Sequence, residues 1–314
     1  MSVENIIVTG INGFVGEHLA RYLKELGYSV TGIGREPTPK DNVNNLLDTY
    51  YQADLLDYGV FDGFDFTNSK AIIHLAGLAS VADSFKYPDR YIKDNSVMTD
   101  NLLSSALKQG FVGRAVIIST GAIYNPSQTM PLDEDAQTIE SSPYSIGKIA
   151  AEHTAIEYRS KGLDVVIVRP FNHIGPGQNT GFLLADLYSQ VVANQHDNTA
   201  TISVGSLMTR RDYTDVRDIV KAYRLLAIAP SLMYTTYNVS SGNSYSGQDI
   251  VNELSKVMGI TIDTIVDPSR IRPTDAKEII GNSNRIRNEL GWVPSIELSK
   301  TITDFVLNDL TVSK

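Results

Sequence analysis

The sequence has no cysteine among its 314 residues, which excludes disulfide bonds and thiolate metal sites. It has no apolar run long enough to span a bilayer, and its first residues lead into a strand pattern without the charged and apolar parts of a signal peptide. Acidic residues outnumber basic ones by 36 to 27, so the chain as a whole offers no basic surface for nucleic acid. These absences predict a cytoplasmic globular protein that needs no membrane, nucleic acid or metal.

Short β-branched segments alternate with longer stretches of helical periodicity over the first half of the chain. Strands are expected at residues 5–9, 28–33, 70–75, 114–119 and 164–168, and helices at about 14–26, 91–109 and 144–161. This alternation predicts an α/β fold with a parallel, doubly wound sheet. After Arg169 the pattern changes to loops rich in Gly, Pro and Asn with shorter helices, such as 247–258.

Three glycines follow the first expected strand in Thr9-Gly10-Ile11-Asn12-Gly13-Phe14-Val15-Gly16. The first permits a tight turn, the second lets backbone N–H groups approach a pyrophosphate, and the third lets the helix pack close to the strand. An ordinary glycine-rich turn is the alternative, but strand, spacing and helix agree. We therefore predict a dinucleotide-binding Rossmann domain whose cofactor contacts include Gly10, Gly13, Phe14, Val15 and Gly16.

The predicted Rossmann domain comprises residues 1–170 and about 212–240. A smaller, interleaved C-terminal substrate domain is expected from residues 171–211 and 241–314.

The end of the second strand, Gly32-Ile33-Gly34-Arg35, bears on the choice of dinucleotide. NAD sites usually place an acidic residue there to hold the ribose hydroxyls, whereas Arg35 could pair with a 2′-phosphate through two hydrogen bonds. The alternative is a solvated arginine whose field is weakened by Glu36. We expect NADP, that is NADPH in the reducing direction, with NAD as the other possibility.

Further cofactor contacts are expected where later strands end. Asp54 and Leu55 follow a strand-like stretch and are candidates for contacts to the adenine. Leu75, Ala76 and Gly77 end another strand, where small residues let a cofactor pass, and the preceding His74 is interpreted as a packed strand-end residue.

A tyrosine and a lysine stand four residues apart in Pro143-Tyr144-Ser145-Ile146-Gly147-Lys148, and this spacing puts both on one face of a helix. Ser142 can cap that helix and Pro143 suits its first turn. A neighbouring ammonium and a helix N-terminus should lower the pKa of Tyr144 from its usual value of about 10, which suits proton exchange with a substrate oxygen. The pair alone is weak evidence, but the strand ending in Ser119-Thr120 adds a hydroxyl for the same oxygen.

The chain resembles the extended short-chain dehydrogenases/reductases, the NAD-dependent epimerase/dehydratase family that acts on nucleotide sugars. The resemblance rests on the order and spacing of the glycine loop, the Ser-Thr strand end and the Tyr-x-x-x-Lys pair. The resemblance covers almost the whole chain. It implies a catalytic triad of Thr120, Tyr144 and Lys148. Of these, Tyr144 and Lys148 are also expected to contact the cofactor. It implies that Asn95 is a structural or cofactor-side residue, although its surroundings keep only Asn95 and Thr99 of the usual Asn-Val-x-Gly-Thr. A homodimer formed through the helices at 91–109 and 144–161 is also implied.

The C-terminal half is similar to the GDP-mannose branch of that family. In Arg169-Pro170-Phe171-Asn172-His173-Ile174-Gly175-Pro176-Gly177-Gln178, the resemblance places Phe171 beside the nicotinamide and Asn172 and Gln178 beside the sugar. Arg211 and Arg272 would hold the diphosphate, and separated arginines in an acidic protein suit such a local clamp. Arg217 is expected to form structural salt bridges with nearby aspartates instead.

The residues after Thr120 separate the possible reactions. Dehydratases that resemble this chain carry an acidic residue there to move protons at C5 and C6, whereas Gly121 and Ala122 transfer none. The expected activity is therefore NADPH-dependent reduction of a nucleotide-linked 4-keto-6-deoxy sugar, similar to GDP-4-keto-6-deoxy-mannose reductases. A 4-epimerase with tightly held NAD remains an alternative, as does a non-catalytic NADP-binding sensor. The sequence leaves open the nucleotide base and the stereochemistry at C4.

Overall fold

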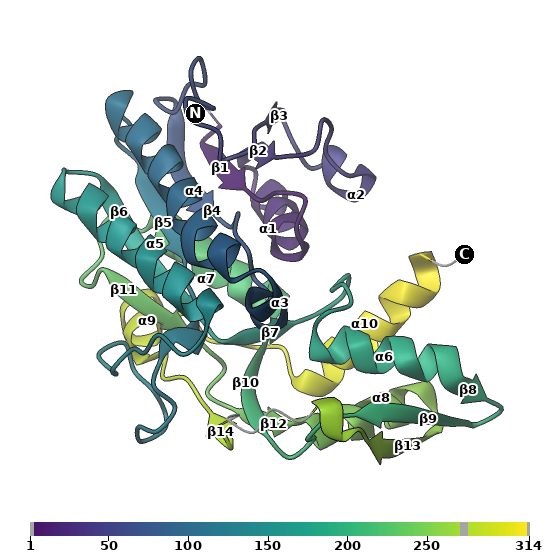
Figure 1. Cartoon of the computed structure of the whole chain (residues 1–314). Coiled ribbons are helices and arrows are strands. Elements are labelled where there is room, and N and C mark those ends of the chain that lie inside the picture. The colour runs from purple at the N-terminus through teal and green to yellow at the C-terminus, as the bar shows by residue number, and fades with distance from the viewer. Residues whose placement is uncertain (1–2, 271–275, 313–314) are drawn as a thin grey trace.

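A computed structural model describes residues 3–270 and 276–312. Its largest element is a seven-stranded sheet with the order β11-β6-β5-β4-β1-β2-β3 (Figure 1). The strands are β1 (Asn5–Thr9), β2 (Ser29–Gly34), β3 (Thr49–Gln52), β4 (Ser69–His74), β5 (Arg114–Ile118), β6 (Asp164–Pro170) and β11 (Thr236–Val239). Every neighbouring pair in this sheet is parallel, so the carboxyl ends of all seven strands face the same edge.

Helices cover both faces of this sheet, as doubly wound folds require (Figure 1). Apolar residues of α1 and α7 pack in one core cluster with β1, and those of α4 and α5 pack in a second cluster on the other face. These helices are α1 (Phe14–Glu25), α4 (Pro88–Lys108), α5 (Pro143–Ser160) and α7 (Val216–Ile228). The central strand β1 is apolar on both sides because both faces are covered, and Ile6, Ile7 and Val8 are fully buried.

The remaining elements form a smaller part around a third core cluster (Figure 1). Its strands are β7 (Asn172–Ile174), β8 (Gln195–His196), β9 (Thr199–Val204), β10 (Arg210–Asp215), β12 (Ser244–Ser246), β13 (Thr261–Val266) and β14 (Glu278–Ile279). Its helices include α6 (Leu183–Asn194), α8 (Gly247–Met258) and α10 (Leu298–Val312), while α9 (Asn284–Leu290) contacts α7 and β11. Strand β10 pairs with β7, β12 and β14, and β9 pairs with β8 and β13.

The predicted fold class is confirmed. The expected strands and helices lie within a few residues of their observed bounds, and the helix at 247–258 matches α8. No ranges were predicted for α6, α7, α9 and α10 of the second half. The short helices α2 (Asp41–Asn44) and α3 (Val81–Lys86) were also not predicted, because segments of four and six residues hold too few turns for a clear period. The proposed domain bounds stay a prediction.

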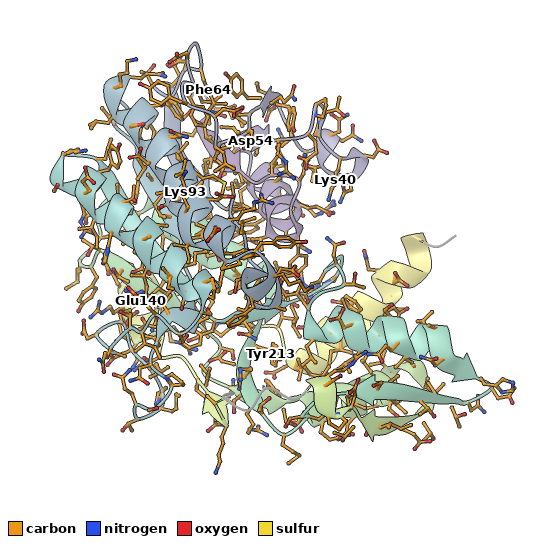
Figure 2. All side chains as sticks on the ribbon, viewed as in Figure 1. Lys40, Asp54, Phe64, Lys93, Glu140 and Tyr213 are labelled. Atoms are coloured by element: carbon orange, nitrogen blue, oxygen red, sulfur yellow. The ribbon has the colours of Figure 1, made fainter. Side chains whose placement is uncertain are left out.

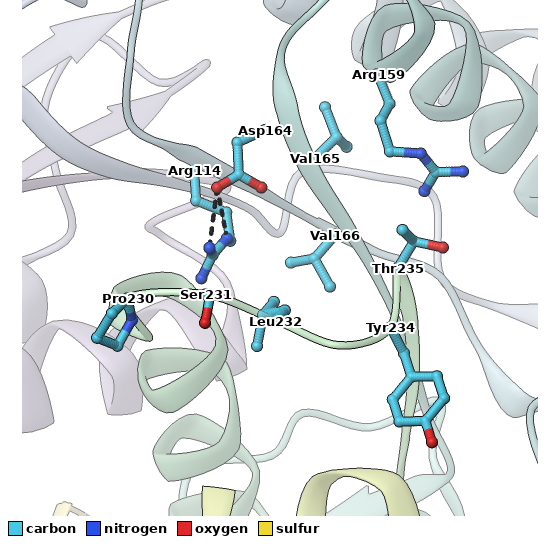
Figure 3. A pocket seen from close by; sticks show the side chains of 10 residues that line it. All are labelled: Arg114, Arg159, Asp164, Val165, Val166, Pro230, Ser231, Leu232, Tyr234 and Thr235. Carbon is cyan, nitrogen blue, oxygen red and sulfur yellow. Dashed lines mark hydrogen bonds and ion pairs between the residues drawn. The ribbon is translucent and has the colours of Figure 1, made fainter. Parts of the chain in front are cut away.

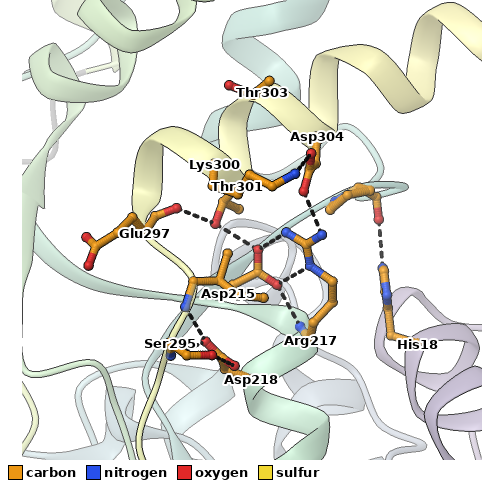
Figure 4. A network of polar contacts seen from close by, with 12 residues as sticks. His18, Asp215, Arg217, Asp218, Ser295, Glu297, Lys300, Thr301, Thr303 and Asp304 are labelled. Atoms are coloured by element: carbon orange, nitrogen blue, oxygen red, sulfur yellow. Dashed lines mark hydrogen bonds and ion pairs between the residues drawn. The ribbon is translucent and has the colours of Figure 1, made fainter.

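Ion pairs join α7 of the large part to α10 of the small part (Figure 4). Arg217 Nη2 lies 2.7 Å from Asp215 Oδ2, and Arg217 Nη1 lies 2.6 Å from Asp304 Oδ2. Thr301 donates to the same Asp215 oxygen over 2.7 Å. The prediction that Arg217 is a structural ion-pair residue is confirmed.

Candidate active site

The glycine loop lies between β1 and α1, against the end of β4. Gly10 has φ +68°, and a Cβ there would come within 2.7 Å of the Ala76 nitrogen, so only glycine fits. A Cβ on Gly16 would overlap the Ile11 carbonyl oxygen. Gly13 is the N-cap of α1 and supplies no side-chain cap, so the first backbone amides of the helix have no side-chain acceptor from it. The loop is thus shaped for close approach of a ligand to its backbone.

The end of β4 connects this loop to the predicted catalytic lysine. Ala76 N donates to Thr9 Oγ1 over 3.2 Å, which holds residues 75–77 beside β1. A Cβ on Gly77 would come within 3.0 Å of Asn95 Oδ1 and 3.4 Å of Lys148 Nζ. A side chain at position 77 would therefore crowd Asn95 and Lys148.

Asn95 is buried at the inner face of α4 and fixes the loop that follows β4. Its Oδ1 accepts from Leu78 N over 2.8 Å, and its Nδ2 donates to Leu78 O over 3.3 Å. Both contacts are to the backbone, so Asn95 has at least a structural role here.

At the end of β2, Arg35 is exposed while Glu36 is held by the glycine loop. Asn12 Nδ2 donates to Glu36 Oε2 over 2.8 Å, and this bond is the main reason why the pKa of Glu36 lies below its ordinary value. The Arg35 guanidinium, one residue after the end of β2, is therefore exposed to solvent.

Asp54 and Leu55 follow β3, on the side of the sheet where β2 and β3 lie (Figure 2). Asp54 Oδ1 accepts from Leu56 N over 3.1 Å, and the Leu55 side chain is buried in the core. The Asp54 carboxylate is therefore the more accessible of the two.

The start of α5 places Tyr144 beside Thr120. Ser142 Oγ accepts from Ser145 N over 3.1 Å and Ser145 Oγ accepts from Ser142 N over 2.9 Å, a reciprocal cap that fixes Tyr144 in the first turn. The buried phenol of Tyr144 hydrogen-bonds with the Thr120 hydroxyl. Because Thr120 Oγ1 already accepts from Ala122 N over 3.1 Å, its hydrogen is available for donation. The two hydroxyls therefore lie together at the ends of β5 and of the loop before α5.

The predicted lowering of the Tyr144 pKa is wrong. Burial raises this pKa above 10, and the hydrogen bond from Thr120 offsets the rise only in part. Lys148 Nζ donates to Ile118 O at the end of β5 over 2.9 Å. Burial lowers the pKa of Lys148 itself to about 8.

His74 is packed and neutral, as its interpretation from the sequence required. Its Nδ1 lies 2.8 Å from Thr9 Oγ1, and burial lowers its pKa to about 3.

Phe171 lies beneath the segment that follows Thr120. A Cβ on Gly121 would come within 3.0 Å of three of its ring carbons, and the ring stacks on Tyr124 with centroids 6.1 Å apart. A Cβ on Gly281 would also meet this ring, at 2.6 Å. The Phe171 ring is thus enclosed between Gly121 and Gly281, which lies just after β14.

The residues after Phe171 carry polar groups toward the same region. The Asn172 side chain is exposed and hydrogen-bonds to the phenol of Tyr213, which lies between the large and small parts (Figure 2). Gln178 Nε2 donates to His173 O over 3.0 Å, but its buried Oε1 has no partner within the described residues. The buried Ser119 Oγ is likewise without one there. A buried polar atom without a partner is a place where a ligand can contribute a hydrogen bond.

The structure describes one of the two predicted diphosphate arginines. Arg211, on β10, donates through Nη1 to the carbonyl oxygens of Arg210 and Ala276 over 2.9 and 3.0 Å. Arg272 lies outside the described residues.

Comparison with known proteins identifies the family. The sequence profile of the NAD dependent epimerase/dehydratase family matches residues 6–240, a segment that contains the glycine loop, Thr120, Tyr144 and Lys148. The chain belongs to this family. The resemblance inferred from the motifs is thereby confirmed.

Relatives within the family catalyse different reactions. The chain is 30% identical to the GDP-6-deoxy-D-mannose reductase of Pseudomonas aeruginosa, with 95% of each protein covered. The UDP-glucose 4-epimerase of Thermotoga maritima, solved with UDP-glucose, superposes with a TM-score of 0.88 at 26% identity, covering 99% of this chain and 100% of the other. RMD of Pseudomonas aeruginosa, solved with NADPH, superposes with a TM-score of 0.81 at 28% identity, covering 98% of each chain.

A separate pocket of about 330 Å³ lies at the opposite end of β5 and β6 (Figure 3). Arg114 lines it and uses its guanidinium to bind Asp164 over 2.9 Å, with Arg159 and Thr235 nearby. It shares no residue with the site around Thr120.

Within residues 3–270 and 276–312, no helix is long and apolar enough to cross a membrane. In the same part of the chain, no three His, Asp or Glu side chains form a group that could hold a metal ion.

Proposed function

We propose that this protein is an NADPH-dependent reductase that converts the C4 keto group of a nucleotide-linked 4-keto-6-deoxy sugar, of the GDP-4-keto-6-deoxy-mannose type, into an alcohol. One observation carries the proposal. Thr120 and Tyr144 converge on one point, and the adjacent Gly121 and Ala122 provide no second acid or base. Reduction needs a hydride and one proton, whereas elimination of water needs further proton transfers at neighbouring carbons.

The glycine loop and Gly77 fit a dinucleotide, because side chains at these positions would crowd the backbone that a cofactor approaches. Gly10, Gly13, Gly16 and the first turn of α1 would hold its pyrophosphate, and Arg35 would pair with a 2′-phosphate. NADPH supplies the hydride when it is bound. NAD is the alternative cofactor, and the solved relative with NADPH supports the first choice.

The chain itself would handle the single proton. Tyr144 is protonated at neutral pH because burial raises its pKa, so it can donate to the developing C4 oxygen. Thr120 would donate a hydrogen bond to the same oxygen through its O–H, because its bond with Ala122 N uses the hydroxyl only as an acceptor. Lys148 supplies positive charge behind this pair and would hold the ribose of the cofactor.

Asn172, Gln178, Arg211 and Arg272 are the proposed contacts to the nucleotide-diphosphate sugar. The unpartnered Oε1 of Gln178 supports this, because a sugar hydroxyl would satisfy it. A homodimer is also proposed, and light scattering after gel filtration should then report twice the chain mass of 34.4 kDa.

The proposal is tested by following NADPH oxidation with GDP-, dTDP- and UDP-linked 4-keto-6-deoxy sugars. We expect turnover with at least one and preference for the GDP-linked substrate, which would match the Pseudomonas aeruginosa relative. Absence of oxidation with all three, in protein that binds NADPH, would contradict the reductase assignment.

A nucleotide-sugar 4-epimerase is the second candidate, and the likeness to the Thermotoga maritima epimerase favours it. The two differ in what happens to the cofactor. An epimerase keeps its dinucleotide through the reaction, so purified protein would release bound NAD on denaturation and would interconvert C4 epimers without consuming NADPH.

A further inference from the structure

A buried ion pair lies on the far side of Lys148 from Tyr144. Arg169 Nε donates to Glu152 Oε1 over 2.9 Å and Arg169 Nη2 donates to Glu152 Oε2 over 2.7 Å, a two-pronged contact. Glu152 and the Arg169 side chain are both largely shielded from solvent. Glu152 stands four residues after Lys148 on α5, so the two side chains share one face of the helix.

The same arginine reaches the segment that carries Thr120. Arg169 Nη1 donates to the Tyr124 hydroxyl over 3.0 Å and to Glu134 O over 3.2 Å. Tyr124 in turn donates to Asn238 Oδ1 over 2.7 Å. One guanidinium at the end of β6 therefore binds the helix of Tyr144 and Lys148 and also the turn that follows Thr120.

We propose that Glu152, clamped by Arg169, is a positioning residue that balances the charge of Lys148 and holds α5 in register with the turn after Thr120. This inference rests on the proposed role of Tyr144 and Lys148. Burying a carboxylate is unfavourable unless it is paired, and the ion-pair partner of Glu152 among the described residues is Arg169. Its negative charge also acts on the Lys148 ammonium one helical turn away.

The charged and polar groups near Lys148 in the described part of the chain are Glu152 on α5, His74 on β4, Asn95 on α4 beside Gly77 and the Ile118 carbonyl on β5. Tyr144 stands one helical turn before Lys148 on the same face of α5. His74 is neutral at physiological pH and Tyr144 is protonated, so Glu152 is the anion among them. Burial alone lowers the pKa of Lys148, and Glu152 acts against this effect.

The test is a direct titration of Lys148 by NMR in protein labelled with ¹³C at lysine Cε, with its signal assigned by its loss in Lys148→Met. We expect a midpoint of about 8 in the unmodified protein. Glu152→Gln should lower it by about half a pH unit or more, because a nearby opposite charge is lost. Glu157→Gln, which removes an exposed carboxylate on the same helix, is the matched control and should leave it unchanged.

Glu152→Gln leaves Arg169 buried without its partner and could unfold the protein. The double variant Glu152→Gln/Arg169→Gln removes both charges and should also lower the midpoint, since Glu152 rather than Arg169 is the charge that acts on Lys148. An unchanged midpoint in whichever variant is folded would overturn the proposal.

This readout needs no substrate, so it stands even if the reductase assignment fails. If turnover is measured, the pH at which kcat/KM falls on the alkaline side should shift in each variant by the same amount as the NMR midpoint of Lys148. A purely structural role for the ion pair would reduce activity without shifting that pH.

Discussion

The ring of Phe171 occupies the space into which any side chain on Gly121 would project. Three of its carbon atoms would lie 3.0 Å from a Cβ at that position, closer than ordinary van der Waals contact. The small residue after Thr120 is therefore required by packing as well as by the chemistry proposed for the site. An acidic residue at position 121 would need both a new place for this ring and a partner for its charge.

Gly121→Ala should lower the free energy of unfolding by about 1–3 kcal/mol, the usual cost of overpacking a buried position. Urea denaturation measures the change. Gly121→Ala/Phe171→Leu should recover part of the loss, because the smaller side chain frees the space. Equal stability of Gly121→Ala and the unmodified protein would show that the ring moves aside at little cost.

Tyr144→Phe should reduce kcat/KM by about 10²- to 10⁴-fold while leaving the fold intact, since it removes only the proton donor. NADPH oxidation and circular dichroism report the two properties. Tyr58→Phe is the matched control, because Tyr58 is 99% exposed. Unchanged activity in Tyr144→Phe would rule out this tyrosine as the acid.

The rate should decline on the alkaline side with a midpoint near pH 8. Burial lowers the pKa of Lys148 to about 8, so the ammonium is present below this pH and is lost above it. Tyr144 stays protonated over the same range because its pKa is raised. A profile of kcat/KM from pH 6 to 10 checks this, and a rate that is constant across pH 7–9 would contradict a need for the charged lysine.

Arg35→Ala should weaken NADPH binding about tenfold or more and leave NADH binding nearly unchanged. The reason is that a hydrogen-bonded charge pair with the 2′-phosphate is lost, whereas NADH has no such phosphate. Fluorescence titration with both dinucleotides measures the effect. Arg21→Ala serves as control, since Arg21 is an exposed arginine of α1 that pairs with Glu17. Equal weakening for both dinucleotides would mean that Arg35 does not read the phosphate.

Features set by neighbours in the sequence were predictable. The glycine loop, the cap at Ser142 and the spacing of Tyr144 and Lys148 depend on adjacent residues, and the structure shows each as expected.

Features set by distant contacts were not predictable. The Tyr144 pKa depends on its burial and on its hydrogen bond with Thr120, and both come from tertiary packing rather than from the local sequence. The pairing of Glu152 with Arg169 was also missed. The spacing of Glu152 from Lys148 was the available signal, but its partner lies on another strand.

The order in which the large sheet is completed constrains synthesis of the chain. Tyr223 and Leu226 of α7 are fully buried in the same core as Ile6 and Val8, and β11 forms the edge beside β6. Residues up to 228, the end of α7, must therefore be synthesised before this face of β1 is fully covered. Until then part of this apolar face is exposed while residues 171–211 emerge, an interval in which binding by a chaperone would be expected.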